Sequence, residues 1–170
     1  MKRILFAIAI FCAASFNLGA QSYGYVNTQK ILEKIPEYVK AQSQLETEAS
    51  GYSKEIENSM KDVESLFNRY QAEKPRLNEQ QRLARENEII AMEKEVKERQ
   101  KGYFGEEGTM AKMTMELVNP IRDRVQKAIE QVAAETGSAF VIDISTAQGI
   151  IYTNPRYDLT AKVLKKLNIQ

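Results

Sequence analysis

The chain has little of the chemistry on which most enzymes depend. Among its 170 residues there is one cysteine, Cys12, and there is no histidine and no tryptophan. If Cys12 is removed with a targeting segment, the remaining chain can form no disulfide, thiol nucleophile or Cys/His zinc site. It also has no histidine to act as a general base. We therefore expect a protein that is not an enzyme and that needs no cofactor or metal.

Residues 1–20 have the layout of a secretory signal peptide. A short basic start precedes an apolar run from Ile4 to Phe16, and a small-residue exit ends at Ala20. The run is too short to span a bilayer stably, so we expect cleavage after Ala20 and export of the rest. A buried N-terminal helix is the alternative.

The charges are nearly balanced. Removing Lys2 and Arg3 from the 24 Lys+Arg leaves 22 against 23 Asp+Glu, a net charge of −1. A nucleic-acid binder would concentrate basic residues on one face, so none is expected here.

A long polar helix-forming stretch occupies residues 37–118, with one turn signal at Pro75. Proline cannot continue a helix, so two arms should fold back on each other as a hairpin. Apolar residues three or four apart predict a narrow coiled-coil seam rather than a wide buried face. In the first arm the predicted stripe is Leu45, Ala49, Tyr52, Ile56, Met60, Val63, Phe67 and Tyr70; in the second it is the sparser Leu83, Ile90, Val96, Tyr103, Met110 and Leu117.

The two ends of the chain, residues 21–36 and 119–170, predict a small body. It should contain three short strands, at residues 23–27, 140–144 and 150–152, with flanking helices. The fold class is therefore α+β, a long helical hairpin with a small strand-containing body. Three strands leave two unpaired edges, which an oligomer could complete as a shared sheet or barrel. A monomer whose terminal helices cover the edges is the alternative.

Several segments together resemble a known family. They are Tyr25-Val26-Asn27, Gln29-Lys30-Ile31-Leu32, Pro36-Glu37, Asn119-Pro120-Ile121, Lys127-Ala128-Ile129, Val141-Ile142-Asp143, Tyr152-Thr153-Asn154-Pro155 and Asp158-Leu159-Thr160. This pattern is similar to the Skp (OmpH-like) periplasmic chaperone family over essentially the whole exported chain.

The resemblance implies a periplasmic homotrimer with a central β-barrel body. Three helical tentacles would enclose a cavity that holds unfolded outer-membrane proteins without ATP. The family is described as having basic tentacles, whereas residues 37–116 carry 13 Lys+Arg and 17 Asp+Glu, a net charge of −4. Weak contact with a membrane surface or with lipopolysaccharide is left open, and no lipopolysaccharide-binding residues are assigned.

A chaperone that holds many unfolded chains needs soft apolar groups on mobile elements, and methionine suits this use. In the adjacent pairs Leu66–Phe67 and Tyr103–Phe104, both members cannot point into one narrow seam, because neighbours on a helix lie about 100° apart. Packing within the seam is the alternative for each residue. The client-binding candidates are Met60, Leu66, Phe67, Tyr70, Leu77, Met92, Tyr103, Phe104, Met110, Met113 and Met115.

Glycines weaken both arms at a similar height. Gly51 in the first arm lies opposite the region of Gly102, Gly105 and Gly108 in the second. Each glycine costs a helix up to about 1 kcal/mol relative to alanine, so we expect a hinge; local packing of small residues is the alternative.

Two further functions compete with the chaperone hypothesis. One is a structural coiled-coil adaptor or spacer of the cell envelope that binds one folded partner. The other is a hydrolase whose site has no recognisable motif. Asp143, in an apolar strand, needs a partner, and we expect it to cap a turn or to pair with a basic residue of the body.

Overall fold

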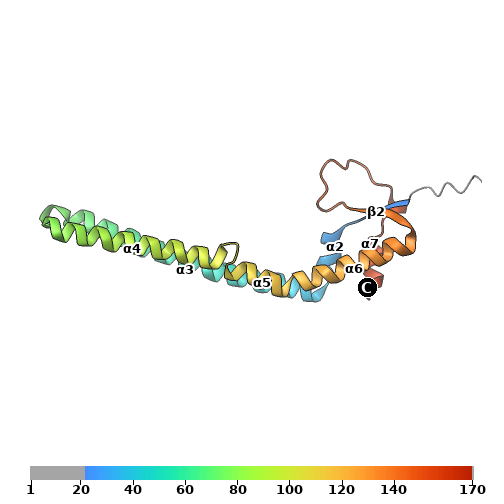
Figure 1. The fold of residues 1–170 in the computed structure, drawn as a ribbon, viewed down its shortest axis with the longest axis horizontal. Coiled ribbons are helices and arrows are strands. Elements are labelled where there is room, and N and C mark those ends of the chain that lie inside the picture. Colours follow the sequence, from blue (N-terminus) through green and yellow to red (C-terminus); the bar gives the residue numbers. More distant parts are fainter. Residues whose placement is uncertain (1–21, 170) are drawn as a thin grey trace, which may run out of the picture. The chain divides into compact units, whose positions relative to one another are not determined.

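The computed structural model describes residues 22–169, so the predicted signal peptide lies outside the described residues. Within this range the chain forms two compact units. One consists of residues 32–124, and the other combines the described residues up to 31 with those from 125 onward. The secondary structure is mostly helical with a small two-stranded sheet, which confirms the α+β class (Figure 1).

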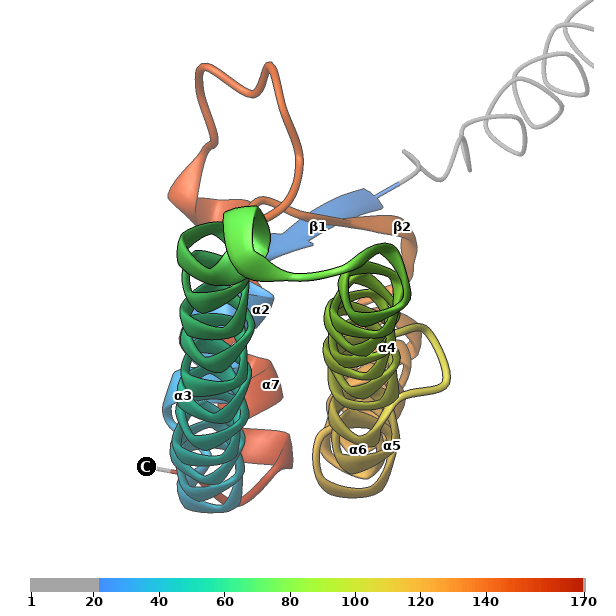
Figure 2. The same ribbon diagram turned by 90° about the vertical axis from the view of Figure 1, so that its left-hand side faces the viewer.

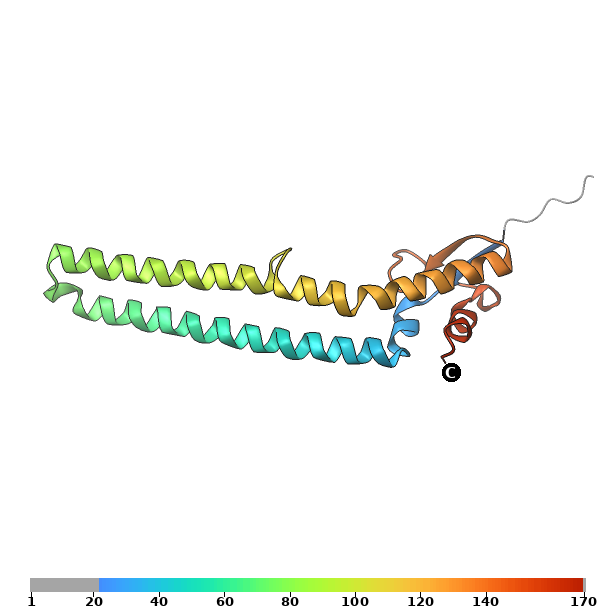
Figure 3. The same ribbon diagram turned by 60° about the horizontal axis from the view of Figure 1, so that its bottom comes forward.

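The first unit is a helical hairpin. Helix α3 (Pro36–Glu73) has 38 residues and is about 57 Å long at 1.5 Å per residue. Helices α4 (Glu79–Phe104) and α5 (Thr109–Leu117) return along it (Figure 3). Viewed end-on, the hairpin is two parallel rods joined at the tip by the 3-10 turn η1 (Lys74–Arg76) (Figure 2). The predicted hairpin is confirmed.

The tip is closed by a capping box. The Asn78 side chain accepts a hydrogen bond from the Gln81 backbone N–H at 2.9 Å, and the Gln81 side chain accepts one from the Asn78 N–H at 3.0 Å. Two of the unpaired N–H groups at the start of α4 are thereby satisfied. Pro75 occupies the 3-10 turn, where its missing N–H removes no helical hydrogen bond.

The second arm is interrupted at its glycines. Helix α4 ends at Phe104 and α5 begins at Thr109, and the intervening residues 105–108 form a short loop that stands out from the arm (Figure 3). Helix α6 (Asn119–Thr136) follows after a one-residue break at Val118, and Pro120 is its second residue.

The second unit contains the sheet. Strand β1 (Ser22–Val26) pairs in parallel with β2 (Ser138–Asp143) (Figure 2). The short helices α2 (Thr28–Glu33), η2 (Pro155–Tyr157) and α7 (Thr160–Lys166) complete this part of the chain. Its buried apolar residues are Val26, Ile31, Val125, Ala128, Ile129, Val132, Leu159 and Val163.

The predicted third strand at residues 150–152 is wrong. This segment has no regular secondary structure, and Ile151 is 99% exposed. The two edges of β1 are already taken, one by β2 and the other by an isolated bridge between Tyr25 and Asp158. A β-prone sequence forms a strand only where it joins a ladder, and residues 150–152 pair with no strand among the described residues.

Asp143 links the end of β2 to the start of α2. Its carboxylate accepts hydrogen bonds from the Thr28 N–H (3.1 Å) and hydroxyl (2.5 Å), and from the Ser145 N–H (3.0 Å) and hydroxyl (2.7 Å). This confirms its predicted turn-capping role. Burial would raise the pKa of Asp143, but the hydrogen bonds from Thr28 and Ser145 outweigh burial and hold that pKa below its ordinary value.

Asn27 caps α2, and Asp158, which precedes the α7 N-cap residue Leu159, closes a turn at the start of α7. The Asn27 side chain accepts from the Lys30 N–H at 2.9 Å, and the Asp158 side chain accepts from the Thr160 N–H at 2.8 Å. The two threonine hydroxyls instead bond across the unit: that of Thr28 to Asp143, and that of Thr160 by accepting from the Asn27 N–H at 3.1 Å.

Candidate functional site

The seam of α3 follows an unbroken heptad rhythm. From Leu45 onward the more buried positions recur in alternating steps of four and three residues. They are Leu45, Ala49, Tyr52, Ile56, Ser59, Val63, Leu66, Tyr70 and Glu73. Met60 and Phe67 belong to the predicted stripe but lie one residue past it, and they are 51% and 45% exposed. The prediction was wrong at these two positions because it assigned only apolar residues to the seam. The seam positions instead recur at a constant spacing, even where the residue at that position is polar, as at Ser59.

In α4, too, the seam differs from the predicted stripe by one residue at some positions. Its less exposed positions are Arg82, Arg85, Ile89, Met92, Val96, Arg99 and Tyr103, again in alternating steps of three and four. Leu83 and Ile90 were predicted to lie in the seam, but they are 58% and 61% exposed, and Ile89 is buried instead. Three of the seven seam positions are arginine, so the second arm contributes few apolar groups to the contact.

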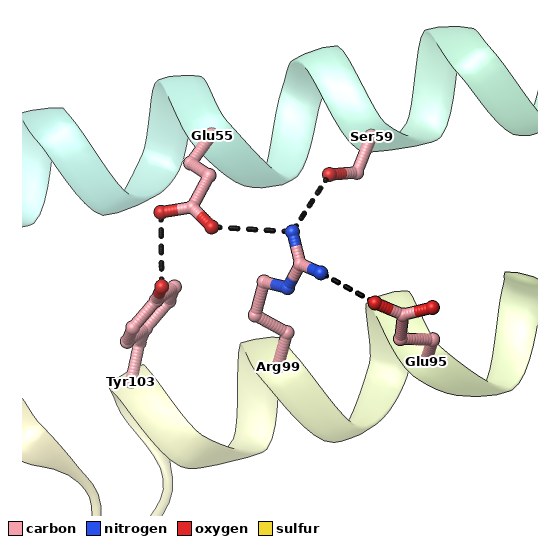
Figure 4. Close-up of polar contacts among 5 residues, drawn as sticks. All are labelled: Glu55, Ser59, Glu95, Arg99 and Tyr103. Carbon is pink, nitrogen blue, oxygen red and sulfur yellow. Dashed lines mark hydrogen bonds and ion pairs between the residues drawn. The ribbon is translucent and has the colours of Figure 1, made fainter.

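A polar cluster holds the arms together near the glycine loop (Figure 4). From α4, Arg99 reaches across to Glu55 at 3.2 Å and to Ser59 at 3.4 Å, and it pairs with Glu95 of its own helix at 2.6 Å. The Tyr103 hydroxyl donates to Glu55 at 2.9 Å, which favours the neutral phenol and raises the pKa of Tyr103.

Aromatic contacts between the arms lie next to this polar cluster. The rings of Tyr52 and Tyr103 stack, and Phe104 packs edge-on against Tyr52. Further along, the hydroxyl of the buried Tyr70 donates to Glu86. This hydrogen bond raises the pKa of Tyr70.

The two adjacent pairs divide as the sequence predicts. Leu66 and Tyr103 lie in the seam and are partly buried, whereas Phe67 and Phe104 are exposed. Among the other client-binding candidates, Met60 and Met115 are exposed and Leu77, Met92, Met110 and Met113 are partly exposed. Tyr70 is only 4% exposed, so its ring is held between the arms.

Heptad geometry places the exposed apolar side chains of both arms on one face of the hairpin. Met60 and Phe67 each follow a seam residue of α3, and Leu83 and Ile90 each follow a seam residue of α4. Successive residues lie about 100° apart around a helix axis. In an antiparallel pair, the residues that directly follow seam positions therefore lie on the same side of the hairpin in both helices. We name this side the apolar face; its members are Val39, Met60, Phe67, Leu83, Ile90 and Phe104.

Contacts between the arms support this assignment. Tyr70 bonds to Glu86, which lies on the apolar side of α4 in the heptad rhythm. Arg99 bonds to Glu55 and Glu95, which lie on the other side of α3 and α4 respectively. At heptad positions on that other side, the helices carry small or polar residues such as Gly51, Ala84 and Ala91 and no large exposed apolar group.

Three members of the apolar face are not among the predicted binding candidates: Val39, Leu83 and Ile90. Leu83 and Ile90 were assigned to the seam instead. Seven residues separate Leu83 from Ile90, the same spacing that separates the seam positions Arg82 and Ile89, so spacing within α4 alone does not show that both lie outside the seam.

The four predicted hinge glycines differ in the space that each leaves for a Cβ atom. An added Cβ at Gly51 or Gly102, inside helices, would meet nothing within 4 Å. At Gly105 it would lie 2.5 Å from the Lys101 carbonyl oxygen, and at Gly108 2.8 Å from the Tyr103 carbonyl oxygen. The loop between α4 and α5 therefore depends on its glycines for close backbone approach, while the other two glycines do not.

A second exposed apolar surface lies in the sheet-containing unit. Tyr23 of β1 stacks on Phe140 of β2 and on Tyr157, with ring centroids 5.9 Å and 5.1 Å apart. Tyr23 and Phe140 nevertheless remain 51% and 54% exposed. The other exposed large apolar residues of this unit are Ile142, Ile150, Ile151 and Tyr152.

The described part of the chain contains no group of three or more Cys, Asp or Glu side chains placed to hold a metal ion. None of its helices is long and apolar enough to cross a membrane.

The fold and its exposed faces define a class of protein: a small α+β unit joined to a long, sparsely packed helical hairpin with apolar groups left on its surface. The chain belongs to the family described as outer membrane protein (OmpH-like), whose profile matches residues 22–167. This confirms the predicted family, which is one of chaperones and not of enzymes.

Two curated relatives are similar to the chain over nearly its full length. The chaperone protein Skp of Yersinia enterocolitica is 28% identical over 169 residues, covering 98% of this chain and 99% of the relative. An uncharacterised protein of Aquifex aeolicus is 26% identical over 168 residues, covering 99% and 97%. The crystal structure of a putative outer membrane chaperone (OmpH-like) from Caulobacter crescentus has a TM-score of 0.61 at 12% identity, covering 86% of this chain and 83% of that one, and shows a shared fold.

Proposed function

We propose that this protein is an ATP-independent holdase chaperone of the periplasm that binds unfolded outer-membrane proteins and prevents their aggregation. The observation that carries this proposal is the apolar face. Large side chains of both arms are about half exposed on one side of the hairpin, within a family of chaperones. Soluble proteins rarely leave such a stripe uncovered unless it binds something.

The residues proposed to touch clients are those whose side chains are available. Met60, Phe67, Phe104 and Met115 are exposed, and Leu83, Ile90 and Val39 join them. Partly exposed candidates contribute at their free edges: Leu66, Leu77, Met92, Tyr103, Met110 and Met113. Tyr70 is left out, because its buried ring bonds to Glu86 and packs between the arms.

We also propose that the working form is a homotrimer whose strands form a shared barrel. Support comes from the sheet-containing unit, where Tyr23, Phe140 and Ile142 are exposed on a two-stranded sheet. The β-prone residues 150–152 have no partner strand among the described residues. A neighbouring subunit could supply the missing strand edge, and three hairpins would then enclose a space for the client.

Light scattering measures the mass of the assembly. We expect the mass of three subunits, and the mass of a single subunit would contradict an enclosed space between hairpins.

The function is tested by aggregation of unfolded membrane proteins on dilution from denaturant. The wild-type protein should suppress aggregation of several unrelated outer-membrane proteins, without nucleotide. The double variant Phe67→Ser/Ile90→Ser should lose much of this effect, because two central side chains of the apolar face are gone. The control Ala84→Ser/Ala91→Ser changes exposed residues on the opposite side and should keep it.

Two outcomes would contradict the proposal. No suppression by the wild-type protein would refute it, and equal suppression by both double variants would refute the role of the apolar face. Selective binding to a single folded partner would favour the adaptor or spacer function instead. A spacer, however, is best served by a well-filled seam, whereas this seam carries Arg82, Arg85 and Arg99.

A further inference from the structure

The apolar face carries a border of carboxylates. Helix neighbours three or four residues apart lie side by side on the surface. On α3, Met60 therefore lies between Glu57 and Glu64, and Phe67 follows Glu64 by three residues. All of these side chains are exposed in the described structure.

The border is repeated on α4. Leu83 lies between Glu79 and Glu86, four residues before it and three after. Ile90 lies in the same way between Glu86 and Glu93. Each of the four central apolar residues thus has at least one glutamate beside it on its own helix.

Several of these carboxylates have no partner within residues 22–169. The side chains of Glu64, Glu79 and Glu93 make neither a hydrogen bond nor an ion pair with any described residue. Glu57 pairs with Lys61 at 2.6 Å, and both side chains are more than 60% exposed. Glu86 accepts the hydrogen bond from Tyr70 and forms no ion pair with a described residue.

Lysines of the arms lie mainly away from this face. In the heptad rhythm, four of them occupy the position diametrically opposite the seam, on the outer edges of the hairpin: Lys54, Lys61, Lys94 and Lys101. Only Lys74 and Lys97 share the apolar face with the glutamates. The face is therefore both apolar and net negative.

We infer that the apolar face selects unfolded polypeptide segments in which apolar residues alternate with lysine or arginine. This inference rests on the proposed chaperone function and names its preferred clients. The apolar side chains of such a segment cover Met60, Phe67, Leu83 and Ile90, while its cations reach the adjacent carboxylates. A second copy of this hairpin is a poor occupant, because its own face carries the same negative border and is repelled.

The test uses two labelled, unstructured peptides of equal length and identical apolar residues. One has lysine at every polar position and the other has glutamate. Fluorescence anisotropy with the wild-type protein at about 20 mM salt should show about tenfold tighter binding of the lysine peptide, since several exposed charge pairs act together. The difference should shrink strongly by about 1 M salt, where the screening length is about 3 Å.

Variants assign the preference to this face. Glu64→Gln/Glu93→Gln removes two unpartnered carboxylates and should reduce the lysine preference to about twofold to threefold. The matched control Asp62→Asn/Glu98→Gln removes two charges on the opposite side and should leave the preference unchanged. A lysine–serine peptide without apolar residues should bind at least about tenfold more weakly, because burial of apolar area is lost.

Equal affinity for the two peptides at low salt would overturn the inference, and so would an equal loss of preference in the control variant. If aggregation of unfolded membrane proteins is still suppressed in that case, the proposed function stands and only the charge preference fails. If neither peptide binds and no aggregation is suppressed, both proposals fail.

Discussion

The rings of Tyr52 and Tyr103 stack across the two arms with centroids 4.1 Å apart and an interplanar angle of 14°. They lie next to the loop where the second arm is interrupted, and the Tyr103 hydroxyl also bonds to Glu55. In an arm with so few buried apolar residues, this aromatic pair is one of the larger contacts that hold α4 against α3.

We expect Tyr52→Leu and Tyr103→Leu to interact in a double-mutant cycle. Aromatic pairs contribute about 0.5–1.5 kcal/mol beyond their buried area, so the two variants together should cost less than the sum of the singles by about that amount. Urea unfolding followed by circular dichroism measures it. Pairing Tyr52→Leu with the exposed, distant Leu83→Ala should give additive effects, and a vanishing coupling for the tyrosines would contradict their role.

Alanine at Gly51 and Gly102 should stiffen and stabilise the arms. Both positions are helical and have open space for a Cβ, so each change should raise the free energy of unfolding by up to about 1 kcal/mol. If these glycines act as a hinge, small-angle scattering and spin-label distances should also show a narrower range of arm conformations. An unchanged range in a stabilised variant would contradict a hinge at Gly51 and Gly102.

Gly105→Ala serves as the contrasting variant. Its Cβ would lie 2.5 Å from the Lys101 carbonyl oxygen, a backbone atom that cannot move without disturbing the last turn of α4. We expect a loss of about 1–3 kcal/mol in the free energy of unfolding, as for other overpacked sites.

Gly24→Ala should destabilise the sheet-containing unit. The added methyl would lie 2.5 Å from Leu159 Cδ1 and 2.9 Å from its Cγ, and Leu159 is 95% buried. We expect a loss of about 1–3 kcal/mol, because the leucine has little room to shift. Gly24→Ala combined with Leu159→Ala should recover part of the loss from the glycine change. A neutral Gly24→Ala would show that β1 and the Leu159 region separate easily.

Asp143 should make the stability of the protein depend on pH in acid. Its folded-state pKa is below the ordinary value of about 3.9, so its contribution is complete above that pH and is lost as the pH falls through the lower, folded-state pKa. Asp143→Asn should therefore cost about 1–2 kcal/mol at pH 7 and less at pH 3, measured by urea unfolding. A difference from the wild type that is the same at both pH values would contradict this account.

Much of the hairpin can be read from the sequence because its signals are local. Pro75, the Asn78–Gln81 capping box and the apolar spacing of residues 45–56 all act within a few residues, and all three are present in the structure. The error at Met60, Phe67, Leu83 and Ile90 has one cause. An apolar residue next to a seam position is indistinguishable from a seam residue when only one arm is considered.

The failed strand at residues 150–152 has a related cause. Ile and Tyr favour strands, yet a strand exists only as part of a ladder, and the partner must come from elsewhere in the chain or from another subunit. The residues of this segment do favour a strand, but local propensity cannot show whether a partner strand is available, and the predicted pairing was wrong.

By itself, the sequence determined the two-armed hairpin, its tip, the α+β class and the family, since periodicity, proline, capping residues and motif order are properties of short stretches of chain. Tertiary structure alone decided which apolar residues are left over for binding. The physical reason is that the antiparallel register of α3 and α4 places Leu66, Ile89 and also the charged Arg99 in the seam between the helices. That choice turns Phe67 and Ile90 outward onto one common face.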